Sequence, residues 1–151
     1  MTARLMIMGL MTVRLGRAVL PLLLLTRLSL PAAADTLYDQ LGGQPGITLI
    51  VGKAVALYMT DDRIKADFDN INPDRLRSRL ADNLCQLTGG PCQYRGRSMA
   101  AAHNGLEVTQ AKFNAVAEDF RTAMAQAGVP YWTQNRIIAL LAPMQRDIVT
   151  R

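Results

Sequence analysis

The chain contains a single histidine, His103, in the segment SMAAAHNGL at residues 98–106. Neutral imidazole is a common metal ligand, and one axial imidazole is enough to hold the iron of a haem. A lone histidine on a helix is more often a structural or surface residue than a metal ligand. The residues around His103 must therefore decide between these two interpretations.

Two cysteines, Cys85 and Cys92, form the second group of reactive side chains. In an exported protein, an even and closely spaced pair of cysteines is typical of a disulfide. A zinc site would need two more ligands, and the chain has one histidine, so zinc is disfavoured. A disulfide is the favoured interpretation, and a redox-sensing pair is the alternative.

The first 34 residues have the composition of a secretory signal peptide. Basic residues precede an apolar stretch at 18–26, and small residues at 32–34 offer a cleavage site before Asp35. Arg27 interrupts the apolar residues and is against this interpretation. An uncleaved membrane anchor is the alternative, but the stretch is shorter than the roughly 20 residues that span a bilayer. We expect a signal peptide at 1–34 and an exported, periplasmic domain at 35–151 without stable membrane insertion.

The positive charge of the chain belongs largely to this targeting segment. The whole chain has a formal net charge of +5, and four of its basic residues, Arg4, Arg14, Arg17 and Arg27, precede Asp35. The remaining 13 basic and 12 acidic residues leave a net charge of +1. The charge therefore gives no support to nucleic-acid binding.

Four long amphipathic helices are predicted after Asp35, and no alternating strand pattern is present. Their apolar positions are 47, 50, 51, 54, 55 and 58; 76, 80, 84 and 87; 113, 116, 117, 120 and 124; and 137, 141, 144 and 148. Asn72 and Pro73 begin the second helix, a third opens near Thr109, and Gly128 ends it. The last is expected from about Trp132. Each helix must bury its apolar face, so the pattern predicts one all-α domain.

Five segments, in this order and spacing, resemble the group 1 truncated haemoglobins. They are LYDQLGGQPGI at 37–47, TGGPCQYRGR at 88–97, AAHNGLEVT at 101–109, AGVP at 127–130 and LAPM at 141–144. The resemblance extends from residue 37 to about 149. It implies the truncated-globin fold, a two-over-two helical sandwich that encloses haem b. No Cys-x-x-Cys-His motif is present, so a c-type thioether attachment of the haem is not expected.

The resemblance also assigns roles to individual residues. His103 corresponds to the proximal iron ligand, and Phe68 to an aromatic side chain on the haem edge. Leu76 and Leu80 correspond to positions on the distal helix that face the bound gas. The remaining wall and propionate positions are taken by Val108, Phe113, Val116 and Arg79. An arginine near a propionate would make a charge-assisted contact.

The distal side departs from the pattern of the family. Family members often have a Phe-Tyr pair where this chain has Ala54 and Val55, and often a glutamine where it has Leu80. An apolar wall without a hydrogen-bond donor would cost bound dioxygen about 1–3 kcal/mol. That corresponds to roughly ten- to hundredfold weaker binding. Tyr58 and Asn83 are the alternative donors.

The resemblance implies a haem b protein that binds diatomic gases (O2, CO or NO) or transfers electrons to and from a redox partner protein. The apolar distal wall argues against oxygen storage. A haem enzyme, either a nitric oxide dioxygenase or a peroxidase-like protein, is the second hypothesis. It ranks lower because no distal acid–base group is evident. The third hypothesis is a helical domain without a cofactor that is stabilised by its disulfide.

Overall fold

Helix α2 (Gly43–Tyr58) is the central element of the fold, and it packs against both α3 (Pro73–Leu87) and α5 (Gln110–Gln126). The computed structural model describes residues 35–150, so the expected signal peptide at 1–34 lies outside the described residues. Every apolar position predicted on the inner face of α2 is buried. These positions are Ile47, Ile50, Val51, Ala54, Val55 and Tyr58.

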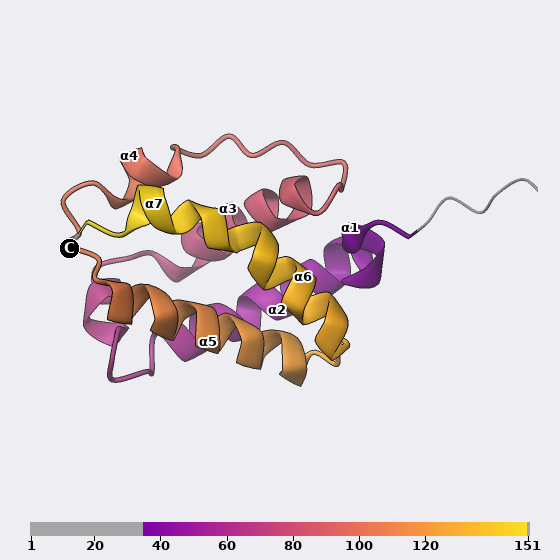
Figure 1. The fold of residues 1–151 in the computed structure, drawn as a ribbon, viewed down its shortest axis with the longest axis horizontal. Coiled ribbons are helices and arrows are strands. Elements are labelled where there is room, and N and C mark those ends of the chain that lie inside the picture. The colour runs from indigo at the N-terminus through magenta and orange to yellow at the C-terminus, as the bar shows by residue number, and fades with distance from the viewer. Residues whose placement is uncertain (1–34, 151) are drawn as a thin grey trace, which may run out of the picture. The chain divides into compact units, whose positions relative to one another are not determined.

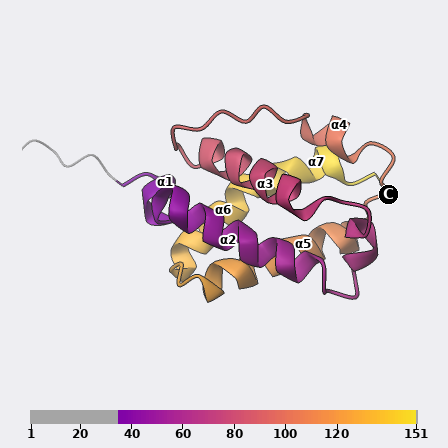
Figure 2. The ribbon, with the colours of Figure 1, turned by 180° about the vertical axis from the view of Figure 1, so that it is seen from behind.

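The other described elements are also helical. They are α1 (Leu37–Gln40), η1 (Lys65–Phe68), α4 (Met99–His103), α6 (Tyr131–Leu141), η2 (Ala142–Met144) and α7 (Gln145–Ile148). Helices α2 and α3 form one layer and α5 and α6 the other (Figures 1 and 2). Residues 35–150 contain no strand, which confirms the all-α, two-over-two prediction. None of the helices in this part of the chain is long and apolar enough to cross a bilayer.

The predicted signals at helix ends are confirmed. The side chain of Asn72 accepts a hydrogen bond from the backbone N–H of Arg75 at 2.9 Å, and Pro73 is the first residue of α3. Thr109 caps α5 in the same way, through the N–H of Lys112 at 3.2 Å. Such caps satisfy backbone donors that have no partner within the helix.

Glycine and proline determine one helix start and one helix break. Helix α2 begins at Gly43, four residues before the first of its predicted apolar positions, because Gly42 supplies a left-handed N-cap with a φ of 84°. A Cβ on Gly46 would lie 1.8 Å from the carbonyl oxygen of Leu41, so only glycine allows this close approach. The last helix is broken after Leu141, because Pro143 lacks the N–H that an α-helix needs there.

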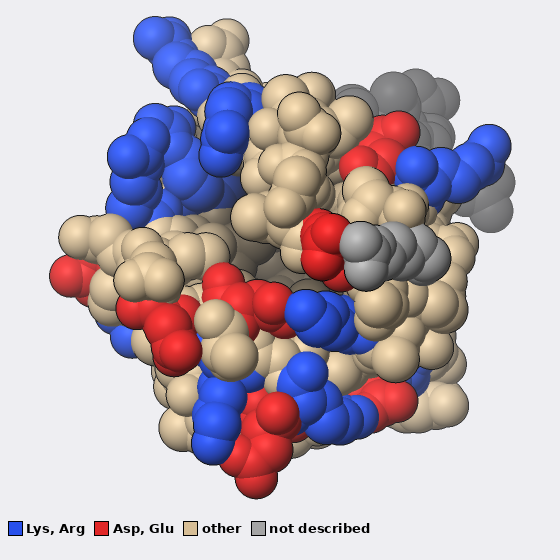
Figure 3. Space-filling model, turned by 90° about the vertical axis from the view of Figure 1, so that its left-hand side faces the viewer, with Lys and Arg blue, Asp and Glu red and all other residues tan. Residues whose placement is uncertain are grey.

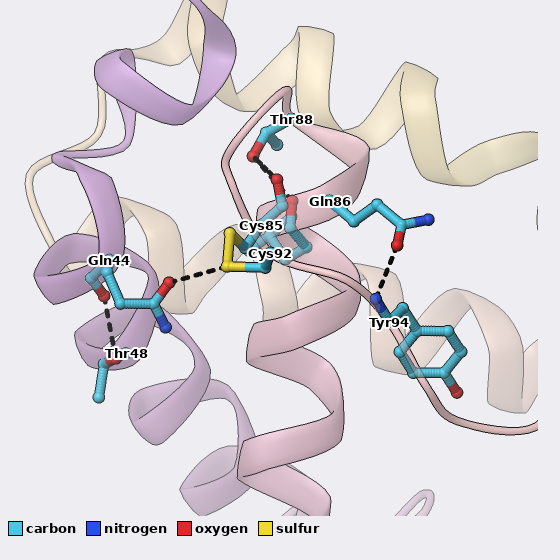
Figure 4. Close-up of a disulfide and its surroundings, with 8 residues drawn as sticks. Gln44, Thr48, Cys85, Gln86, Thr88, Cys92 and Tyr94 are labelled. Atoms are coloured by element: carbon cyan, nitrogen blue, oxygen red, sulfur yellow. Dashed lines mark hydrogen bonds between the residues drawn. A yellow bond between two sulfur atoms is a disulfide. The ribbon is translucent and has the colours of Figure 1, made fainter.

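The predicted disulfide between Cys85 and Cys92 is confirmed, and it joins the end of α3 to the segment that leads to α4 (Figure 4). Cys85 is fully buried. The Oε1 atom of Gln44 on α2 lies 3.3 Å from the sulfur of Cys92. A Cβ on Gly90 would lie 2.5 Å from the ring of Tyr38 and 2.7 Å from the sulfur of Cys85. The turn after α3 is therefore closely packed around the sulfurs.

Replacing both cysteines in a Cys85→Ser/Cys92→Ser variant is expected to lower the free energy of unfolding by about 2–3 kcal/mol, because the disulfide closes a short loop in the unfolded chain. Urea unfolding of the oxidised protein measures this loss. Dithiothreitol should bring the wild-type protein to the stability of the variant and leave the variant unchanged. Equal stability of the oxidised protein and the variant would contradict the expectation.

Candidate functional site

His103 is the last residue of the short helix α4, and its imidazole is oriented by the backbone of the same helix. Ser98 caps α4 by accepting a hydrogen bond from the N–H of Ala101. The Nδ1 atom of His103 lies 2.8 Å from the carbonyl oxygen of Met99. A carbonyl can only accept, so the proton of the neutral ring lies on Nδ1. The Nε2 atom then keeps its lone pair, as a metal ligand requires.

Several apolar side chains on the elements before and after α4 in the sequence are only half-buried. The predicted ones are Phe68 on η1, Leu76 and Leu80 on α3, Val108 after α4, and Phe113 and Val116 on α5. Further half-buried apolar residues on the last three helical elements are Ile138, Leu141, Met144 and Ile148. Large apolar residues are usually buried in a closed core, so these positions are suited to contact with an apolar group.

The surface is hollowed on the side where η1, α4 and the end of α7 lie (Figure 3). Basic side chains gather on one side of the hollow, and acidic side chains border another. An ion pair between Lys112 Nζ and Asp67 Oδ1, at 2.7 Å, ties η1 to α5. Basic side chains at this rim would suit the acidic groups of an amphipathic cofactor, and the half-buried apolar side chains named above would suit its apolar part.

The donor set fits haem better than it fits a metal ion held by protein alone. Residues 35–150 contain no group of three or more histidine, cysteine, aspartate or glutamate side chains that could hold a metal ion. Both cysteines are in the disulfide. A haem brings four nitrogen ligands of its own and needs one axial ligand from the protein, which His103 can supply.

Known proteins are similar to this chain in fold and in sequence. The crystal structure of truncated hemoglobin from Tetrahymena pyriformis in its Fe(III) form superposes with a TM-score of 0.75 at 26% identity, covering 78% of this chain and all of that one. The group 1 truncated hemoglobin of Nostoc sp. is 38% identical over 95 residues, which cover 63% of this chain and 80% of the relative. The relative from Tetrahymena thermophila is 33% identical over 94 residues, with coverages of 62% and 78%. The family model described as Bacterial-like globin matches residues 36–150.

This chain belongs to the bacterial-like globin family. Its relatives are group 1 truncated hemoglobins, which confirms the resemblance seen in the sequence. Membership assigns haem-based gas binding to this globin in general terms.

The residues expected on the distal side of this globin come from two helices. Val55 and Ala54 lie on α2 and are fully buried, whereas Leu76 and Leu80 on α3 are half-buried. Tyr58, an alternative donor, stacks on Phe68 with ring centroids 5.4 Å apart. Burial raises the pKa of Tyr58, and the negative charge of Asp119 raises it further, so its hydroxyl stays protonated. Asn83, the other alternative, is half-buried on α3.

Arg79 is exposed on α3 and forms no ion pair with any of residues 35–150. Its neighbour Arg77 is paired with Asp74 at 2.7 Å. The pairing of Arg77 agrees with the interpretation of that residue as part of a solvated helix face. Arg79 is free to meet an anionic group, so its expected role toward a haem propionate stays a prediction.

Two features near the site were missed in the sequence. The first is the carbonyl of Met99, which follows from its place four residues before His103 on a helix. The second is the buried carboxylate of Asp119 on α5, whose Oδ2 has no hydrogen-bond partner within the described chain. Its Oδ1 lies 4.0 Å from Arg63, whose guanidinium also binds Asp61 and Glu118. The charged groups that surround Asp119 include Arg63 and Asp61, which are far from it in the sequence, so no local pattern marks it.

The pKa of Asp119 is raised, first by loss of water on burial and then by the negative charge of Asp61, while Arg63 opposes the shift. A carboxyl with a raised pKa binds its proton more tightly in the folded state, so stability falls as pH rises through that pKa. Asp119→Asn removes this charge. We expect the variant to be more stable than the wild type at neutral pH, with the difference shrinking toward acid pH.

Urea unfolding at a series of pH values measures the effect of Asp119→Asn. The matched control is Asp147→Asn, which replaces an exposed carboxylate on α7 that forms no ion pair within residues 35–150. The same pH series on this control shows what the loss of an exposed carboxylate does by itself. A difference for Asp119→Asn that is constant with pH would show that Asp119 is ionised without cost.

Two small surface cavities lie away from His103. One is lined by α5 and α6, including Asn114, Arg121 and Ile138. The other is lined by α2 and α3, including Gln44 and Arg77. Neither cavity is lined by His103 or by any of the residues predicted to contact haem.

Proposed function

We propose that this globin is an exported haem b protein that binds diatomic gases, or passes electrons, at an iron held by His103. The observation that carries the proposal is the bond from Nδ1 of His103 to the carbonyl of Met99. That bond fixes the tautomer and the ring orientation, and it increases the basicity of Nε2. Bound haem would supply the iron that holds the gas or the electron.

The surrounding residues have distinct tasks in this proposal. Phe68, Leu76, Leu80, Val108, Phe113 and Val116 would contact the porphyrin and exclude water from it. Val55 would complete an apolar distal wall, and Arg79 would pair with a propionate. A wall without a donor favours carbon monoxide and nitric oxide over dioxygen, because bound dioxygen carries more negative charge and needs a hydrogen bond. Export to the periplasm and removal of residues 1–34 are part of the proposal, and they rest on the sequence.

The test is a hemin titration of the chain 35–151, followed by reduction under carbon monoxide. We expect a sharp Soret shift that saturates at one haem per chain. Saturable binding with a carbon monoxide spectrum supports the proposal. Absence of stoichiometric binding would leave a helical domain stabilised by its disulfide, and the proposed function would be wrong.

A further inference from the structure

The two most exposed large hydrophobic side chains among residues 35–150 are adjacent in the sequence, at the start of α6. Tyr131 is 67% exposed and Trp132 is 68% exposed. They lie outside the haem site, because α1 and α6 come together at one end of the fold and η1 and α4 lie at the other (Figures 1 and 2). Single exposed apolar residues are common, whereas these two aromatic side chains lie in the same turn of α6.

Two arginines flank the aromatic pair, and both keep their charge available. The guanidinium carbon of Arg121 lies 5.8 Å from the centre of the Tyr131 ring, and its Nη1 donates to Asn135 at 2.7 Å. Arg136 is one helical turn after Trp132 and therefore lies on the same face of α6. Neither arginine forms an ion pair with an acidic side chain in the described part of the chain.

A chain of hydrogen bonds connects this surface to the first described residue. The Oε1 atom of Gln40 on α1 accepts from Thr133 Oγ1 at 3.2 Å and from Arg136 Nη1 at 3.3 Å. The Nε2 atom of Gln40 donates to the carbonyl of Asp35 at 3.0 Å. The α6 end of the domain is therefore tied to the first described residue.

We propose that Tyr131, Trp132, Arg121 and Arg136 form a surface that contacts an anionic phospholipid bilayer, and we name it the α6 aromatic surface. Tryptophan and tyrosine rings locate at the boundary between acyl chains and headgroups, because they are apolar with one polar edge. Arginine binds phosphate groups through several N–H donors. Contact with lipid along this face differs from insertion, and it leaves the haem site at the other end open to solvent.

The chain provides its own probe for this proposal, because Trp132 is its single tryptophan. The chain 35–151, the exported form in the proposed function, is mixed with vesicles of phosphatidylethanolamine and phosphatidylglycerol, with and without bromine on the acyl chains. Bromine quenches tryptophan only at close range, and the ratio of the two fluorescence signals cancels any quenching by haem. We expect bromine to lower the emission of Trp132 at least about twofold, as for a residue at the bilayer interface.

A matched variant separates specific contact from simple tethering of the chain to the vesicle. Trp132→Phe/Ile71→Trp moves the probe to Ile71, which is 37% exposed and follows η1 at the other end of the fold. We expect no bromine quenching in this variant. Equal quenching of the two probes, or none of Trp132, would overturn the proposal.

The charge of the surface is tested with glutamine variants in the same vesicles. Arg121→Gln and Arg136→Gln should reduce the quenching of Trp132, and Arg146→Gln, an exposed arginine on α7, should not. Equal effects of all three would mean that only net charge matters, and the α6 aromatic surface would not be a specific contact. If Trp132 is shielded only as protein concentration rises, without lipid, the surface joins two copies of this chain and the membrane proposal is wrong.

Discussion

Haem should dissociate from a His103→Ala variant more than about a hundredfold faster than from the wild-type protein. The loss of an outer partner of a ligating histidine already costs roughly 10- to 100-fold in metal affinity, and loss of the ligand itself costs more. The effect should be visible as transfer of haem from the globin to excess apomyoglobin, followed in the Soret band. Added imidazole should restore part of the retention, because it can occupy the space left by the side chain.

The fold should not respond to this substitution. Helix α4 has no fully buried residue, and His103 itself is only half-buried, so its truncation leaves no cavity in the core. Circular dichroism of the haem-free wild type and the haem-free variant should therefore agree. Unchanged haem retention without imidazole would rule out His103 as the iron ligand.

Val55→Tyr is expected to slow oxygen dissociation by roughly ten- to hundredfold, because a phenol placed over the iron would donate a hydrogen bond worth about 1–3 kcal/mol. Val55 is fully buried beside the small side chain of Ala54. A larger side chain there should cost about 1–3 kcal/mol of stability through overpacking. Stopped-flow mixing of the oxygenated protein with excess carbon monoxide measures the oxygen off-rate.

Val55→Phe is the matched control for this prediction. It adds the same ring without the hydroxyl, so it shares the packing cost and the steric effect on the gas. A slower off-rate in the tyrosine variant alone would identify the hydrogen bond as the cause. Identical off-rates in the two variants would mean that residue 55 does not lie over the iron.

The helices of this globin could be predicted because their apolar spacing and their end signals lie within the helical segments themselves. The inner face of α2 was predicted in full, since each of its apolar positions serves one core. The start of α3 could be predicted because Asn72 caps the helix and Pro73, which has no backbone N–H, is favoured at the first helical position. The need for glycine at position 46 could not be predicted, because it comes from the carbonyl of Leu41 at the end of another helix. The break after Leu141 was missed because the apolar spacing continues across Pro143.

The candidate site was predictable to a different degree for each kind of residue. His103 is the single histidine, so no other histidine could be assigned to the proximal position. The orienting carbonyl of Met99 follows from helical spacing once α4 is known. Asp119 could not be found, since its burial beside Arg63 and Asp61 depends on the tertiary fold. The roles of the apolar wall residues stay predictions that haem reconstitution will test.

Because α4 is weakly buried, we expect release of the cofactor and unfolding of the domain to be separate events. Helix α4 has no fully buried side chain, and the segment before it is fixed at its start by the disulfide and by a bond from the Tyr94 N–H to Gln86 at 2.6 Å. An element with so few buried contacts opens at low free energy while the rest of the structure persists. Amide hydrogens of α4 should therefore exchange rapidly in the haem-free protein, while those of α2 remain protected. Exchange of the cofactor through an opened α4 would then leave the domain folded and ready to be filled again.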